Sequence, residues 1–181
     1  MFTNRILLFA IILFTSSCGS IGDSLNPSGE DMREDVEVGV TGSDAGQNAP
    51  DFTVYDSLGN SVTLSTELAS TDGVVLYFTM WCPTCSSHQD HMLDTVIPDY
   101  PNVKFLLVDY VSGSLDATRR TEISNGISTT EFTTLADSDK EILDLYNGTM
   151  ATTIVIDSSG VVLLNEDYKD GAKLAEALAS L

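Results

Sequence analysis

Two cysteines separated by two residues, Cys82-Pro83-Thr84-Cys85, stand between a strongly apolar run and a stretch with helical spacing. The run at residues 74–78 is almost continuously apolar and β-prone, which is typical of a strand buried on both faces of a sheet. Residues 84–97 carry apolar side chains at helical intervals until a proline stops them. The order strand, cysteine pair, helix restricts the chain to folds in which this pair begins a helix.

A cysteine at the start of a helix is chemically distinctive. The unpaired backbone N–H groups and the positive end of the helix dipole favour a thiolate over a thiol. We therefore expect Cys82 to attack disulfides and Cys85, one turn further in, to resolve the mixed disulfide. Pro83 suits a first helical turn, where its missing N–H is not needed. The alternatives for a CxxC pair are an inert disulfide or part of a metal site.

The other elements predict one α/β domain over residues 49–181, long enough for a single core. Strands and helices alternate, which implies a central mixed sheet with helices on both faces and an N-terminal β-hairpin extension. Besides the strand at 74–78 and the helix at 84–97, the expected strands are 52–55, 61–64, 103–108, 132–136, 152–156 and 161–164, and the expected helices are 115–125, 139–146 and 171–181.

The N-terminus predicts export. Residues 1–17 contain one cation, Arg5, an apolar run over 6–14 and small residues directly before Cys18. The apolar run is shorter than the about 20 residues that span a bilayer. Small residues before a cysteine resemble the bacterial lipobox, although Thr15 stands where leucine is usual. The resemblance implies acylation of Cys18 and an extracytoplasmic, membrane-anchored protein. The alternative is a secretory signal cleaved elsewhere.

Residues 18–48 follow as an acidic segment rich in Gly and Ser, for which we expect a disordered tether. The formal net charge of −19 argues against nucleic acid as a partner and against electrostatic attachment to anionic lipid. With one of the three cysteines assigned to the lipobox, the remaining pair cannot form a four-cysteine zinc site or a framework of several bridges. We expect a redox-active disulfide and no cofactor.

Four sequence features occur in the order of one known family. They are Ala49-Pro50-Asp51-Phe52, Leu58-Gly59, residues 78–85 with the motif Trp81-Cys82-Pro83-Thr84-Cys85, and residues 152–157 followed by Gly160. Residues 49–181 thereby resemble the thioredoxin-like superfamily, most closely its extracytoplasmic TlpA/ResA branch. The resemblance implies a thioredoxin-like fold and a thiol–disulfide oxidoreductase that acts on client proteins and needs a redox partner. It also implies that the active site is supported by Trp81, Pro83, Thr84, Met150, Ala151 and Thr152.

The chain departs from the family at three positions. Ala151 stands where members carry a cis-proline, in a loop that holds the substrate strand and keeps metals off the cysteines. Because a cis peptide before a non-proline residue costs about 3–4 kcal/mol, we expect the Met150–Ala151 bond to be trans. Leu76 replaces the buried acid of thioredoxin, and His88 replaces the glutamate common in the branch. His88 is a candidate base for Cys85, with simple packing as the alternative.

Three other functions are alternatives for this chain. A Cu(I)-delivery protein would take its ligands from Cys82, Cys85, His88 and either His91 or Met150. A peroxidase is suggested by the spacing of Thr79 to the first cysteine, but Val75 occupies the position of the proline that peroxiredoxins carry before that threonine. A non-catalytic binding module on a thioredoxin fold is the third.

Overall fold

The computed structural model describes residues 36–128 and 130–181, and the strands and helices follow the predicted order. The strands are β1 (Thr53–Tyr55), β2 (Ser61–Thr63), β3 (Gly73–Thr79), β4 (Val103–Asp109), β5 (Thr133–Ala136), β6 (Thr152–Asp157) and β7 (Val162–Asp167). The helices are α1 (Leu64–Leu68), α2 (Pro83–His91), α3 (Leu115–Ser124), α4 (Glu141–Leu145) and α5 (Ala172–Leu178), with a π-helical turn η1 (Met92–Val96) and a 3-10 turn η2 (Ile97–Asp99). The sequence missed α1, whose five residues are too few to show a period.

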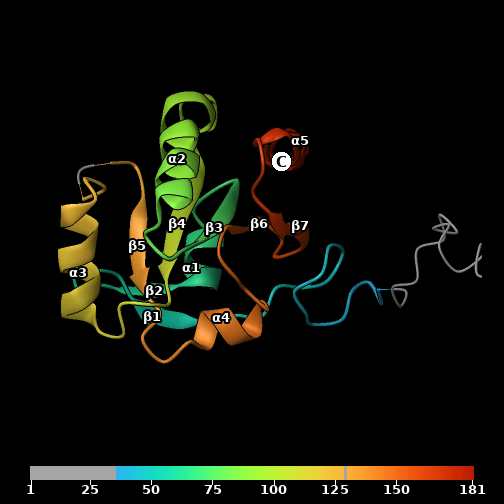
Figure 1. Ribbon diagram of the computed structural model, residues 1–181. Helices are drawn as coiled ribbons and strands as arrows, with labels where there is room; N and C mark the ends of the chain where they lie inside the picture. The colour runs from blue at the N-terminus through green and yellow to red at the C-terminus, as the bar shows by residue number, and fades with distance from the viewer. Residues whose placement is uncertain (1–35, 129) are drawn as a thin grey trace, which may run out of the picture. The chain divides into compact units, whose positions relative to one another are not determined.

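The sheet has the order β5-β4-β3-β6-β7 (Figure 1). Strands β3, β4 and β5 are parallel, whereas β6 and β7 run antiparallel to their neighbours. The central strand β3 is buried along its whole length, which explains why its sequence is apolar without alternation. The predicted mixed sheet and the N-terminal hairpin of β1 and β2 are confirmed.

The two faces of the sheet form two separate cores. The first core lies under β1, β2, α1 and α4, and it includes Val74, Leu76, Phe78, Ile142 and Tyr146. The second core lies under α2, η1 and α5, and it includes Val75, Tyr77, Cys85, Met92 and Leu174. Because side chains alternate along a strand, consecutive residues of β3 enter different cores.

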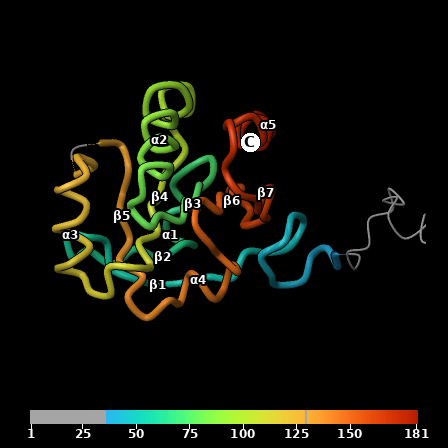
Figure 2. The backbone as a smooth tube through the Cα atoms, viewed as in Figure 1, coloured from blue at the N-terminus to red at the C-terminus, as the bar shows by residue number. Residues whose placement is uncertain are grey.

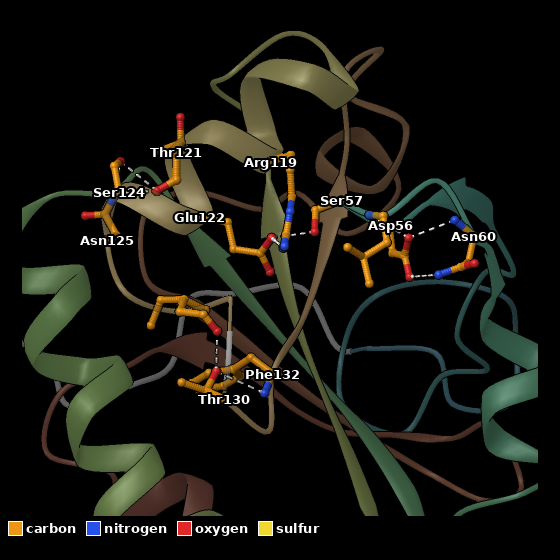
Figure 3. A network of polar contacts seen from close by, with 12 residues as sticks. Asp56, Ser57, Asn60, Arg119, Thr121, Glu122, Ser124, Asn125, Thr130 and Phe132 are labelled. Atoms are coloured by element: carbon orange, nitrogen blue, oxygen red, sulfur yellow. Dashed lines mark hydrogen bonds and ion pairs between the residues drawn. The ribbon is translucent and has the colours of Figure 1, made fainter.

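A buried polar network joins the β1–β2 turn to α3 (Figure 3). Asp56 accepts the backbone N–H of Asn60 and so closes the turn. Ser57 donates to the carboxylate of Glu122, which is buried and also receives a charged hydrogen bond of 2.7 Å from Arg119. A buried carboxylate is tolerated when it is paired in this way. The network fixes the hairpin beside β5, which is one edge strand of the sheet.

The ordered domain begins before Ala49, which differs from the predicted boundary of the tether. Gly46 donates its backbone N–H to the carbonyl of Val162, and Val162 donates to the carbonyl of Gln47. Asn165 of β7 binds the carbonyl of Ser43, whose own side chain is buried. The described part of the predicted tether, residues 36–48, therefore supplies partners for the edge strand β7, whose backbone groups need them.

The predicted signal over residues 1–17, the acylated Cys18 and the remainder of the tether lie outside the described residues. Within the part that the structure describes, no helix has the length and apolar character needed to cross a membrane. Figure 2 follows the chain from residue 36 into β1, through β3 and α2 to β4, and finally through the β6–β7 hairpin into α5.

Candidate active site

Cys82 occupies the N-cap of α2. Its backbone is extended, with φ −87° and ψ 164°, and Pro83 follows as the first helical residue. The Cys82 Sγ accepts the backbone N–H of Cys85 at 3.3 Å. The predicted position at a helix N-terminus is thus observed, with the sulfur directed at the unpaired N–H groups of the first turn.

The two sulfurs are adjacent and reduced. Cys82 and Cys85 are free thiols, and their Sγ atoms are 2.9 Å apart. A disulfide has an S–S length of about 2.05 Å, so an approach of about 1 Å would close it. Cys82 is partly exposed, whereas Cys85 is only 1% exposed. A reagent can therefore reach the first sulfur and not the second.

The hydrogen bonds around Cys82 favour its thiolate. The thiol of Cys85 lowers the pKa of Cys82 most, and backbone N–H groups of Cys85 and Thr84 lower it further, while partial desolvation opposes them. A lowered pKa raises the fraction of the nucleophilic form at neutral pH.

The turn before β6 lies against the same sulfur. The Met150 Sδ is 3.6 Å from the Cys82 Sγ. Ala151 has a left-handed backbone with φ +68° and donates its N–H to the carbonyl of Phe78 at 2.9 Å. No peptide bond is cis in the described ranges, so the expected trans Met150–Ala151 bond is confirmed. Thr152 accepts the backbone N–H of Thr149 at 3.0 Å and closes the turn.

The chain between β3 and the cysteines is held by Thr79. Its hydroxyl accepts the backbone N–H of Trp81 at 3.2 Å and the amide of the buried Gln89 at 3.1 Å. Trp81 has a left-handed backbone, with φ +59°, and packs partly buried against the second core. The Thr79 side chain thereby ties the loop before the cysteines to α2.

Comparison with known proteins places the fold. Residues 45–164 match the AhpC/TSA family, which is about two thirds of the chain. The chain belongs to the AhpC/TSA family. No curated protein matches it. Its thioredoxin-like fold is shared with solved structures that are 16–21% identical in sequence, which confirms the predicted fold class.

Three solved structures share the fold of this AhpC/TSA family member. A thioredoxin-like protein from Aeropyrum pernix has TM-score 0.57 and 16% identity, covering 72% of this chain and 89% of its own. Peroxidoxin BcpB from Mycobacterium tuberculosis has TM-score 0.57 and 21% identity, covering 75% and 94%. A secreted M. tuberculosis disulfide oxidoreductase homologous to E. coli DsbE has TM-score 0.54 and 21% identity, covering 72% and 96%.

In this AhpC/TSA family member, Tyr77 and not residue 76 faces the buried cysteine. Leu76 packs in the first core, whereas Tyr77 and Cys85 share the second. The Tyr77 hydroxyl is 2.9 Å from Nδ1 of His88. Burial, followed by the charge on Cys85, raises the pKa of Tyr77, so the phenol stays protonated beside His88. Sequence reasoning missed Tyr77, although it is the only hydroxyl in the apolar run 74–78.

The two histidines of α2 bind tyrosines and not the cysteines. His88 stacks on Tyr168 with ring centroids 4.6 Å apart, and burial lowers its pKa, as does His91. His91 hydrogen-bonds the Tyr168 hydroxyl, whose pKa is raised to about 12 by burial and then by Asp170. In residues 36–128 and 130–181, no three His, Cys, Asp or Glu side chains converge as metal ligands. The alternative metal set of the two cysteines with His88 is therefore not assembled.

A further tyrosine was also missed. Tyr110 follows β4, and its ring packs against Phe78 with centroids 6.3 Å apart. Burial raises the pKa of Tyr110, and the charges of Cys85 and Cys82 raise it further. No sequence signal distinguishes this tyrosine, because its contact with Phe78 results from the pairing of β3 with β4.

Proposed function

We propose that the chain is a thiol–disulfide oxidoreductase that exchanges disulfides with client proteins through Cys82 and Cys85. The observation that carries this proposal is the pair itself: a partly exposed thiol of lowered pKa at a helix N-terminus, 2.9 Å from a buried second thiol. The fold of the AhpC/TSA family supports the proposal but does not by itself define the reaction.

The reaction needs two exchange steps. In the reducing direction, the Cys82 thiolate attacks a client disulfide, the client S–S bond breaks, and one client sulfur leaves as a thiolate that takes up a proton. The Cys85 thiolate then attacks the Cys82 sulfur and expels the second client sulfur, so two electrons pass to the client. A dithiol partner of the same redox class would return the pair to the reduced state, and the same steps in reverse oxidise a client.

Cys85 must lose its proton before the second step, and the Tyr77 hydroxyl lies in the same core, where the charge of Cys85 raises its pKa after burial. That hydroxyl is hydrogen-bonded to Nδ1 of His88 at 2.9 Å, and burial lowers the pKa of His88. We propose that Tyr77 passes the proton of Cys85 to His88. This arrangement replaces a buried carboxylate as the proton acceptor.

The proposed protein works outside the cytoplasm, anchored through an acylated Cys18. The support is the sequence of residues 1–18, namely one cation, an apolar run and small residues before the cysteine. Labelling cells with a palmitate analogue would test the anchor: the full chain is expected to carry the label and to sediment with membranes, and the Cys18→Ser chain to lose both. A labelled Cys18→Ser chain would contradict it.

The exchange reaction is tested on the full chain with Cys18→Ser, which leaves only the proposed pair as thiols. Redox titration should show one two-electron couple, and insulin disulfides should be reduced in the presence of dithiothreitol. Cys82→Ser should reduce the rate to the uncatalysed background. Cys85→Ser should instead accumulate a mixed disulfide with the client, because the resolving sulfur is missing.

Two results would contradict the proposal. One is a Cys82→Ser variant with undiminished insulin reduction. The other is a wild-type pair that consumes peroxide rapidly with a thiol donor yet fails to exchange with any protein disulfide, which would favour the peroxidase alternative.

A further inference from the structure

Three sulfur atoms meet at the start of α2. The Cys82 Sγ is 2.9 Å from the Cys85 Sγ and 3.6 Å from the Met150 Sδ. They come from two segments far apart in the sequence, since Met150 lies 68 residues after Cys82. From this geometry we propose that the reduced protein binds one Cu(I) ion between the two thiolates and the thioether of Met150.

The spacing of the sulfurs suits a three-coordinate ion. With metal–sulfur bonds of about 2.3 Å, the sulfurs of a planar trigonal site are separated by about 4 Å. The separation of 3.6 Å between Cys82 and Met150 is already close to this value. The separation of 2.9 Å between the two cysteines must widen by about 1 Å, which a rotation of the partly exposed Cys82 side chain can supply.

The donor set selects Cu(I) over zinc. Thiolate and thioether sulfurs are soft ligands that prefer Cu(I), whereas structural zinc takes four ligands from Cys, His, Asp and Glu. In the described ranges, no third side chain of those four types joins Cys82 and Cys85. His88 is held away by its hydrogen bond to Tyr77. The third ligand available is therefore the methionine sulfur.

The site is open to exchange of its ion. Met150 is 41% exposed and Cys82 is partly exposed, so a partner can reach two of the three ligands. Formation of the Cys82–Cys85 disulfide would consume both thiolates and abolish the site. Binding of Cu(I) and disulfide exchange are thus alternative states of the same pair, and the inference depends on the reduced cysteines but not on their turnover.

The proposal is tested by anaerobic competition with a chromophoric Cu(I) chelator, using the full chain with Cys18→Ser. We expect one Cu(I) per reduced protein and none for the disulfide form. Met150→Leu should weaken the affinity at least about tenfold, the factor that corresponds to about 1.4 kcal/mol. X-ray absorption at the copper edge should show three sulfur neighbours, and two in Met150→Leu.

Met80→Leu is the matched control, because Met80 is a similarly exposed methionine of the same region, at 43%. It should keep the affinity of the parent chain. Titration of the two thiols with a chromogenic disulfide checks that every variant has an accessible Cys82. Equal affinity of Met150→Leu and the parent chain would overturn the proposal, as would nitrogen neighbours at the copper or zinc bound with the same stoichiometry. A chain that binds Cu(I) in this way but reduces no disulfide would refute the proposed function alone.

Discussion

The two faces of β3 differ in chemistry although they belong to one strand. On one side Val74, Leu76 and Phe78 enter a core that is apolar around them. On the other side Tyr77 enters a core that contains the thiol of Cys85 and borders His88. The difference teaches that a strand can stabilise the fold with one set of alternate residues and serve a reactive site with the other.

Each face contains one fully buried tyrosine with a single hydrogen bond from its hydroxyl. Tyr77 is bonded to Nδ1 of His88 at 2.9 Å, and Tyr146 donates to the carbonyl of Pro50 at 2.7 Å. The first bond links the cysteine core to a titratable group, whereas the second only ties α4 to the segment before β1. Substitutions on the two faces should therefore separate stability from reactivity.

Leu76→Ala should have the largest effect, and on stability alone. Leu76 is fully buried, and shortening such a leucine costs about 2–5 kcal/mol through lost burial and the cavity left behind. Urea unfolding of the reduced chain measures this loss. The pH profile of Cys82 alkylation should be unchanged, because Leu76 packs in the other core. A shifted profile would show that the two faces are coupled.

Tyr77→Phe and Tyr146→Phe form a matched pair, and each should destabilise the chain less than Leu76→Ala does. Each leaves one part-buried polar group without its hydrogen-bond partner, so each should lose about 1–2 kcal/mol of unfolding free energy. Only Tyr77→Phe should slow resolution of the mixed disulfide, by about tenfold, with the deficit shrinking at high pH where Cys85 ionises without help. Stopped-flow decay of a preformed mixed disulfide measures this step. Equal rates of mixed-disulfide resolution in the two variants would show that Tyr77 does not transfer the proton of Cys85.

The smallest expected effect is a shift in the midpoint of the pH profile for Cys82 alkylation. Iodoacetamide should react with Cys82 along a titration curve whose midpoint lies below the about 8.5 of a free thiol, because hydrogen bonds favour the thiolate. The rate therefore falls as pH drops through the lowered pKa of Cys82. Cys85→Ala should raise the midpoint, since the thiol of Cys85 is the largest cause of the shift. An unchanged midpoint in this variant would assign the shift to the helix N-terminus.

Most of the fold followed from local patterns. The apolar run 74–78, the turn residues 157–160 and the proline after residue 97 predicted β3, the β6–β7 hairpin and the end of the α2 region. The position of Cys82 at the start of α2 followed from the same patterns, since a strand and a helix on either side of the pair leave few other arrangements. Residues 36–48 were misjudged because their order depends on an edge strand more than 100 residues away.

The site was only partly predictable for the same reason. The sequence identified the cysteines and the trans bond at Ala151, because spacing and the cost of a cis peptide are local properties. It misassigned the surroundings of Cys85: position 76 lies in the other core, and the group facing the thiol is Tyr77. Strand alternation decides between these two neighbours, and the direction of that alternation depends on which helices cover each face.

The sequence by itself determined the order of the elements, the thiol pair and its place at a helix N-terminus, since each depends on residues within one or two turns of chain. Only the tertiary structure decided that Met150 touches Cys82 and that His88 turns to Tyr77. These contacts arise where β6 and the turn before it pair with β3, and where α2 packs on the sheet. Pairing and packing of distant segments are set by the whole core, so no local pattern records them.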